Sequence, residues 1–326
     1  MSDTLFIKKT KDDCVMKTQV SEVVTLFDKN SFVRRSLFRR LALNPIDGLR
    51  FYEFTGELTK LPIIGIFFKE YMRLYYKYIH SRSVKLPIEE IEKVIKNATH
   101  ISVGPCPCRM IHEGNCDKPL YSCMKIDSFS EYVSALEKKE NELGGERGNK
   151  YSKDLTTDEA LAVVRNARKH GLILSLESCV SPYQNQICMC CTCCCVELRL
   201  REILGPAMGP YGPYVPEVDA GNCNGCGKCV KKCPYHTIEM KDEKAVINLD
   251  KCAHCGICAE ACPNGSLSMR LDKRLIETYP EPGFFKTMAI VAAVLQGHLL
   301  FIPFKMFGSQ KYKYHAAKPR KSDVVV

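Results

Sequence analysis

Two cysteine runs in the last third of the sequence constrain its fold and chemistry more than any other feature. Each run reads C-x2-C-x2-C-x3-C-P, once at Cys223–Pro234 and again at Cys252–Pro263. Three thiolates two residues apart on a curling loop can reach three irons of one iron–sulfur cube, and the longer step starts a helix that carries the fourth thiolate away. Zinc ligands usually come as C-x2-C pairs, so the repeated triplet favours iron–sulfur ligation.

This stretch resembles the two-cluster bacterial ferredoxins over about residues 217–270. The resemblance implies a pseudo-twofold fold of β-hairpins and short helices that moves one electron at a time at low potential, with strands near 237–240 and 244–248. It also implies that the fourth cysteine of each run ligates the cluster of the other run. One [4Fe-4S] cluster would then be held by Cys223, Cys226, Cys229 and Cys262, and the second by Cys252, Cys255, Cys258 and Cys233.

Ten further cysteines lie in two blocks upstream of these runs. The first block holds Cys106, Cys108, Cys116 and Cys123, and the second holds Cys188, Cys190, Cys191, Cys193, Cys194 and Cys195. Four thiolates suffice for one [4Fe-4S] cluster or one zinc ion. Successive side chains diverge, so the second block cannot all bind one metal, although it repeats the triplet spacing at positions 188, 191 and 194. We expect one or two further iron–sulfur clusters in this region.

Arg109 directly follows the first two of these cysteines. A guanidinium there could donate to a cluster sulfide or offset the negative charge of a cluster, and we assign it as a cofactor-binding residue. The alternative is an ordinary surface arginine. The nearby His112 is more typical of an ordinary loop histidine than of a metal ligand.

Each cysteine block follows a predicted helix and strand. Pro87 predicts the start of a helix, and residues 100–104 read as the strand that follows it. Thr156 starts a capping-box pattern that predicts a helix over 157–169, and residues 172–176 read as the next strand. With the cysteine blocks and runs, this order resembles a family of cysteine-rich 4Fe-4S binding proteins of anaerobic bacteria and archaea over about residues 87–270. The implied function is electron transfer, without a defined substrate.

We expect an α+β fold in five segments. A helical N-terminal region would precede a cysteine-rich α/β core, and a Gly/Pro linker would lead to the ferredoxin-like domain of hairpins and short helices. A C-terminal hydrophobic helix and a mobile basic tail would follow. The predicted bounds are 1–86, 87–204, 205–216, 217–270 and 271–326. Within the first segment, residues 61–80 have the spacing of an ordinary packed helix.

Charge and hydropathy indicate where partners would bind. The formal net charge of +10 is not uniform, because residues 284–326 carry seven Lys or Arg against one Asp. Residues 287–304 carry no charged side chain. Three readings of this segment are a helix buried in a partner or core, an interfacial membrane helix, and a short bilayer span. We expect redox partner proteins, and a membrane surface or membrane-bound complex contacted through 284–307.

Several other classes are not supported by the sequence. We find no helix-turn-helix, zinc-finger or RNA-binding motif, so no nucleic acid is expected. No phosphate-binding glycine loop is present, so no nucleotide cofactor is expected. The polar start of the sequence does not resemble a secretory signal, and its 20 cysteines suit metal ligation in a reducing cytoplasm. We therefore expect a cytoplasmic protein, peripheral to the inner face of the membrane if it associates with one.

The leading functional hypothesis is an iron–sulfur protein that relays low-potential electrons through two ferredoxin clusters and one or two more. It is an electron carrier or a subunit of a redox complex rather than a stand-alone enzyme, and no catalytic residue is assigned. One alternative is a reductase whose cysteine-rich domain carries a special cluster with an open coordination position. Another alternative is a regulatory or scaffold protein in which the additional cysteines hold structural zinc.

Overall fold

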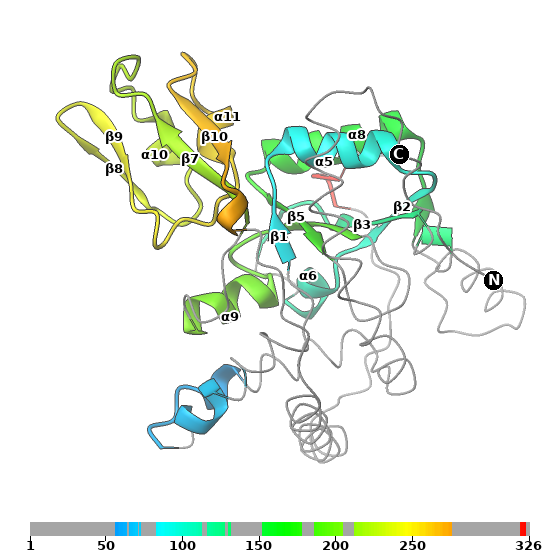
Figure 1. Ribbon diagram of the computed structural model, residues 1–326. Helices are drawn as coiled ribbons and strands as arrows, with labels where there is room; N and C mark the ends of the chain where they lie inside the picture. Colours follow the sequence, from blue (N-terminus) through cyan, green and yellow to red (C-terminus); the bar gives the residue numbers. More distant parts are fainter. Residues whose placement is uncertain are drawn as a thin grey trace, which may run out of the picture.

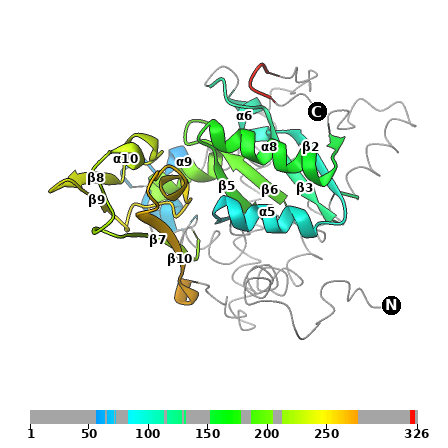
Figure 2. The same ribbon diagram turned by 90° about the horizontal axis from the view of Figure 1, so that it is seen from above.

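A computed structural model describes the middle of the chain and a short segment further on. Figures 1 and 2 show two parts in contact: a sheet carrying helices, and a smaller part made of short strands and single-turn helices. The described residues are 56–63, 65–70, 72, 83–112, 116–127, 130–131, 152–177, 186–204, 212–275 and 320–323.

Six antiparallel strands form the larger sheet, in the spatial order β1-β5-β6-β3-β2-β4. Neighbours in this order are often far apart in sequence, so the sheet brings both upstream cysteine blocks together. Its strands are β1 Ser83–Lys85, β2 Ile101–Pro105, β3 Tyr121–Ile126, β4 Lys153–Asp154, β5 Ile173–Glu177 and β6 Gln186–Cys190.

Two helices, α5 (Ile88–Asn97) and α8 (Thr157–Lys169), cover one face of this sheet (Figure 2). Side chains alternate between the two faces of a strand, so every second residue points at the helices. Burial of these apolar side chains against the helices is the main source of stability for this part of the chain. The strand residues in this core are Val84, Ile101, Val103, Met124, Ile126, Leu174, Leu176, Ile187 and Met189.

Helix α8 begins and ends where the sequence predicts. The Thr156 hydroxyl accepts a hydrogen bond from the Glu159 N–H, and the Glu159 carboxylate accepts one from the Thr156 N–H at 2.7 Å. This is the predicted capping box, which satisfies two backbone donors at the helix start. After the last turn Gly171 adopts φ +71°, a left-handed conformation that costs glycine little. The predicted helix over 157–169 is therefore confirmed.

The opposite face of the sheet carries thiols and polar groups. In the strand register Cys123 lies opposite Cys188, and Ser175 lies between Cys188 and Lys85. Two helices lie on this side, away from α5 and α8 (Figure 1). They are α6 (Pro107–Ile111) and α9 (Val196–Leu204). The cysteines of β3 and β6 therefore project from the face that the apolar core leaves free, whereas Cys191 and Cys194, which follow β6, pack with that core.

The smaller part contains two pairs of antiparallel strands and two single-turn helices. Strands β8 (Ile238–Lys241) and β9 (Lys244–Ile247) form a hairpin near the residues predicted for it. Strands β7 (Tyr214–Val218) and β10 (Leu267–Leu271) form the other pair, so β7 begins inside the predicted linker 205–216.

The two single-turn helices of this part start in the same way, one in each cysteine run. Helix α10 (Lys228–Lys232) follows Gly227 at φ +65°, and helix α11 (Ile257–Glu260) follows Gly256 at φ +78°. Left-handed backbone at the residue before each helix favours glycine. The repeated C-x2-C-G-x-C spacing therefore produces the same loop and helix twice.

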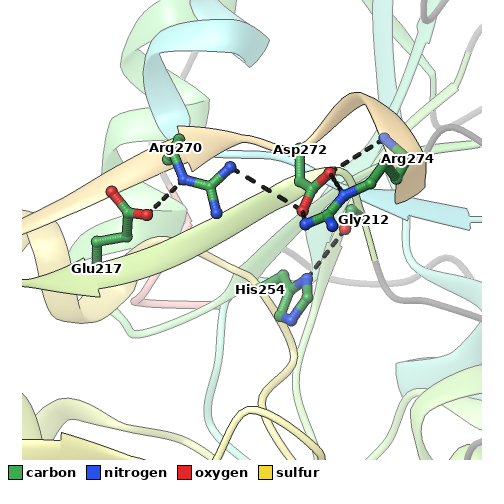
Figure 3. Close-up of polar contacts among 6 residues, drawn as sticks. All are labelled: Gly212, Glu217, His254, Arg270, Asp272 and Arg274. Atoms are coloured by element: carbon green, nitrogen blue, oxygen red, sulfur yellow. Dashed lines mark hydrogen bonds and ion pairs between the residues drawn. The ribbon is translucent and has the colours of Figure 1, made fainter.

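Polar contacts fix the end of the β7–β10 pair (Figure 3). The carboxylate of Asp272 accepts hydrogen bonds from Nε of Arg274 at 2.9 Å and Nη2 at 2.6 Å. These bonds lower the pKa of Asp272 to about 2. Nearby, Nδ1 of His254 lies 3.0 Å from the carbonyl oxygen of Gly212, which ties the second cysteine run to the residues that precede β7.

Arg168, near the end of α8, links the two parts of the structure. Its Nε and Nη2 donate to Oε1 of Glu260 at 2.9 and 2.6 Å, and its Nη2 also donates to the carbonyl of Cys255. Its Nη1 donates to the carbonyl of Leu172 at 3.1 Å. A Cβ on Gly256 would lie 3.3 Å from Cα of Pro87, so the second run packs directly against the larger part.

Several predictions fall largely outside the described residues. These include the uncharged segment 287–304, residues 1–55 of the predicted helical region, and half of the predicted helix over 61–80. Where that helix is described, Ile66 and Phe67 are 68% and 74% exposed. Among the helices of the described part, none has both the length and the apolar character needed to cross a bilayer.

The predicted mobile tail needs correction at residues 320–323. The Arg320 guanidinium donates to the carbonyls of Cys116 at 2.7 Å and Lys118 at 2.9 Å. The Asp323 carboxylate accepts from the N–H of Tyr121 at 2.9 Å. These contacts hold segment 320–323 (red in Figure 1) against the loop that carries Cys116, because that loop offers backbone groups with no strand partner.

Candidate metal centres

Four cysteines of the smaller part line one cavity. Cys252, Cys255 and Cys258 of the second run share it with Cys233, the last cysteine of the first run. The N–H groups of Thr237 and His254 point at the thiols of Cys233 and Cys252, each at 3.4 Å. Four thiols with backbone donors aimed at sulfur are the donor set that a [4Fe-4S] cluster requires, so these residues fit one.

Burial dominates the electrostatics of this cavity. It raises the pKa of Cys252 to about 11 and that of Cys258 to about 12. Each of these thiols also feels Cys233 and Cys255 as neighbouring negative charges when ionised. A coordinated thiol is deprotonated. A cation shared by the four sulfurs would therefore offset the repulsion between the negative charges that deprotonation creates.

The other four cysteines of the two runs are more exposed. Cys226 is exposed and Cys223 and Cys262 are half-buried, whereas Cys229 is 7% exposed. The Ser266 hydroxyl lies 3.1 Å from the thiol of Cys262 and also contacts that of Cys223. Backbone N–H groups of Gly225 and Ala245 lower the pKa of Cys223. The two runs therefore form a more exposed set of thiols and a more buried one, which are called the exposed and the buried set below.

A third group of thiols lies on the cysteine face of the larger sheet. Its members are in hydrogen-bond contact one after another. The group draws on the N-cap and first turn of α6, on β3 and β6, and on the residue before α9. In order of contact the members are Cys106, Cys108, Cys195, Cys190, Cys188 and Cys123.

Contacts within this third group separate the pKa values of its thiols. The hydrogen bond with Cys108 and the charge of Arg109 together lower the pKa of Cys106 to about 6. Hydrogen bonds from Cys108 and Cys190 likewise lower the pKa of Cys195. The sequence alone did not indicate which of these thiols favour the anionic, metal-binding form.

Charged side chains border the third group, and sequence reasoning missed them. The Lys85 ammonium is fully buried and lies 2.7 Å from the carboxylate of Glu197. Burial raises the pKa of Glu177 to about 7, with Glu197 and Cys195 adding to the effect. The sequence around Lys85 looks like an ordinary solvent-facing strand. Its position beside the thiols follows only from the pairing of β1 with β5.

Arg109 is a buried residue, so the surface alternative is wrong. It is 1% exposed, and its guanidinium donates to the carbonyl oxygens of Pro119 at 2.8 Å and Met189 at 2.7 Å. Burial by itself would lower the pKa of Arg109, but the neighbouring thiols of Cys106 and Cys191 raise it. Its positive charge therefore lies between two cysteine groups.

The remaining predicted ligands gather in a fourth group. The ligand atoms of this set lie within 4.8 Å of one another, apart from the third group. The cysteine triplet seen in the sequence does not form one set of ligands, because Cys188 joins the third group. The His112 ring instead lies 2.7 Å from a guanidinium nitrogen of Arg199. The members of the fourth group are Cys116, Cys191, Cys193 and Cys194.

Comparison with known proteins identifies one part of the chain. A search of curated proteins found no match. Residues 222–266, which include all eight cysteines of the two runs, match the family model of the 4Fe-4S dicluster domain. The chain therefore contains a ferredoxin-type 4Fe-4S domain joined to a second cysteine-rich part, and its chemistry is iron–sulfur electron transfer.

Proposed function

We propose that this protein relays low-potential electrons through two [4Fe-4S] clusters in the ferredoxin-type domain and a third cluster on the cysteine face of the larger sheet. The observation that carries the proposal is one apolar cluster of buried residues. It contains Cys190 and Cys195 of the third thiol group together with Cys255 of the second run. Electron transfer requires such closeness between redox groups held at fixed positions.

The ligands of the two ferredoxin-type clusters follow from the cysteine spacing, and the thiol geometry supports them. Cys252, Cys255, Cys258 and Cys233 around one cavity support the crossed assignment of the buried cluster. Cys223, Cys226, Cys229 and Cys262 would hold the exposed one. Such clusters accept and release one electron at a time, and the chain tunes them by burial and by N–H groups aimed at sulfur.

The exposure of the thiols supports a direction from surface to interior. Cys226 is exposed, so a redox partner protein would exchange electrons beside it. Cys229 of the exposed set and Cys258 of the buried set share one apolar cluster, with Cys223, Cys233 and Cys262 at its edge. Cys255 then connects the buried set to the third group.

The ligands proposed for the third cluster are Cys106, Cys108, Cys190 and Cys195. These four are consecutive in the chain of thiol contacts, and two of them face Cys255. The guanidinium of Arg109 lies beside Cys106. It would offset part of the negative charge of a cluster bound there. Lys85, whose charge lowers the pKa of Cys195, would do the same beside that thiol.

Iron and sulfide counts on anaerobically purified protein test this proposal. We expect twelve irons and twelve sulfides per chain, that is, three clusters of four. Cys195→Ser should remove four of each, and EPR of the reduced variant should retain the two ferredoxin-type signals. Cys14→Ser is the matched control, because Cys14 belongs to none of the cysteine motifs, and it should leave the counts unchanged.

Other outcomes would contradict the proposal in distinct ways. Eight irons in both the natural chain and Cys195→Ser would exclude the third cluster while retaining the ferredoxin-type pair. A colourless, iron-free protein would exclude the whole assignment. An EPR spectrum that changes on addition of small ligands such as cyanide would favour a reductase, in which the buried Lys85 and the half-buried Glu177 would lie beside the open position.

A further inference from the structure

The fourth thiol group is built differently from the other three. Its Sγ atoms all lie within 4.8 Å of one another, although Cys116 comes from a loop and the others from the turn after β6. The Cys116 and Cys194 sulfurs are 3.5 Å apart, and those of Cys193 and Cys194 are 3.8 Å apart. Four thiols from two distant segments thus converge on one point.

These separations have the size of a site for a single ion. A tetrahedral zinc ion binds sulfur at about 2.3 Å, which places the sulfurs about 3.8 Å from one another. A cubane places a cage of iron and sulfide between its thiolates and needs a wider set. The eight cysteines of the ferredoxin-type domain, all in the described part of the chain, form no group this compact. They therefore provide an internal comparison.

The surroundings of the fourth group suit a closed anionic site. Four thiolates and one divalent cation carry a net charge of −2, and Arg109 is hydrogen-bonded to Cys191. The N–H of Lys118 donates to the thiol of Cys116. Cys194 is fully buried, so solvent does not reach it. Such outer contacts orient ligands and offset their charge.

A second observation concerns the loop that supplies Cys116. Segment 320–323 binds this loop through Arg320, Ser322 and Asp323, and its Ser322 carbonyl accepts from Nδ2 of Asn166 on α8 at 2.9 Å. The loop is therefore fixed from outside, whereas the turn after β6 is fixed by the sheet. Holding in place the one ligand that comes from a separate loop is what a structural site requires.

We propose that Cys116, Cys191, Cys193 and Cys194 bind one zinc ion, which joins the loop after α6 to the turn between β6 and α9. All four positions are sulfur from the protein, so no open position is left for a substrate, as in structural zinc sites. The Cys191-x-Cys193-Cys194 spacing is not the paired C-x2-C of common zinc motifs, and only the folded arrangement reveals the site. The proposal is independent of the third cluster.

Metal analysis of the full chain tests this site without any activity assay. We expect one zinc per chain besides the iron, and X-ray absorption at the zinc edge should show four sulfur neighbours at about 2.3 Å. Cys193→Ser should lower the zinc content at least tenfold and leave iron unchanged. Cys193 is the exposed member of the group, so this change disturbs packing least.

Controls separate this proposal from the proposed function. Cys195→Ser changes an adjacent residue outside the group and should lower iron but retain zinc. Sixteen irons without zinc would show that the fourth group holds a cubane, and would overturn the single-ion proposal. Zinc that is absent, or that persists unchanged in both Cys193→Ser and Cys116→Ser, would overturn it as well. If either serine variant misfolds, the absorption spectrum of the natural chain still decides.

Discussion

Replacing Arg168 by alanine should loosen the ferredoxin-type domain from the larger sheet. The Arg168 side chain is 4% exposed and that of its partner Glu260 is 27% exposed. Breaking a buried ion pair by removing one partner costs about 3 to 5 kcal/mol, and the partial exposure of Glu260 points to about 3 kcal/mol. Arg168→Ala also leaves the carbonyls of Leu172 and Cys255 without these donors.

Hydrogen exchange on the loaded protein measures this loss without unfolding it. A cost of about 3 kcal/mol corresponds to roughly a hundredfold faster exchange of the amides in residues 252–262, if these open with the interface. Mass spectrometry of peptides from that stretch, under anaerobic conditions, reports the change. Exchange in the hairpin of β8 and β9 should be much less affected, because Arg168 does not contact it.

A matched control lies one turn away on the same helix. Arg165 pairs with Glu92 at 2.8 Å, but the Arg165 side chain is 55% exposed. Such surface pairs contribute about 0.2 to 1 kcal/mol, so Arg165→Ala should change exchange in 252–262 by a factor of about five or less. The double variant Arg168→Ala with Glu260→Ala should recover part of the loss, because it removes the uncompensated carboxylate. Equal effects of the two arginine variants would refute the reasoning.

Four further substitutions test other parts of the structure. Gly256→Ala and Gly265→Ala both place alanine in left-handed backbone, at a cost of about 1 to 2 kcal/mol. Of these two positions, only 256 has a neighbour within 4 Å of an added Cβ. The Gly256→Ala protein should therefore release iron to a chelator faster than the Gly265→Ala protein. Thr156→Ala should lower the free energy of unfolding by about 1 kcal/mol in thermal melts, because a cap is lost. Asp323→Ala should speed amide exchange in residues 116–121 and leave the iron count unchanged.

The ferredoxin-type domain could be predicted from sequence because its ligands are encoded locally. Within each run, three cysteines and a left-handed glycine lie within seven residues, so spacing alone indicates the loop and the helix that follows. The capping box at Thr156 is equally local, and the predicted helix was accordingly confirmed. Both patterns depend on backbone geometry over one or two turns, which sequence spacing captures.

The division of the upstream cysteines could not be predicted in this way. Cys188 joins the third group because strand register places it opposite Cys123, and Cys194 joins the fourth because a distant loop brings Cys116 beside it. Neither pairing is visible in the spacing of residues 188–195. The same applies to Arg168, which reads as an ordinary basic residue near a helix end but links the two parts of the structure.

The contact of segment 320–323 with the Cys116 loop sets an order for biosynthesis. Arg320 and Cys116 are separated by 204 residues, which a ribosome adds in roughly 10 to 40 s at typical speeds. Throughout that interval the nascent loop lacks the segment that later binds it. Both ferredoxin-type runs leave the ribosome before this segment does. Segment 320–323 can therefore bind the Cys116 loop only after every cysteine in the described part of the chain has been translated.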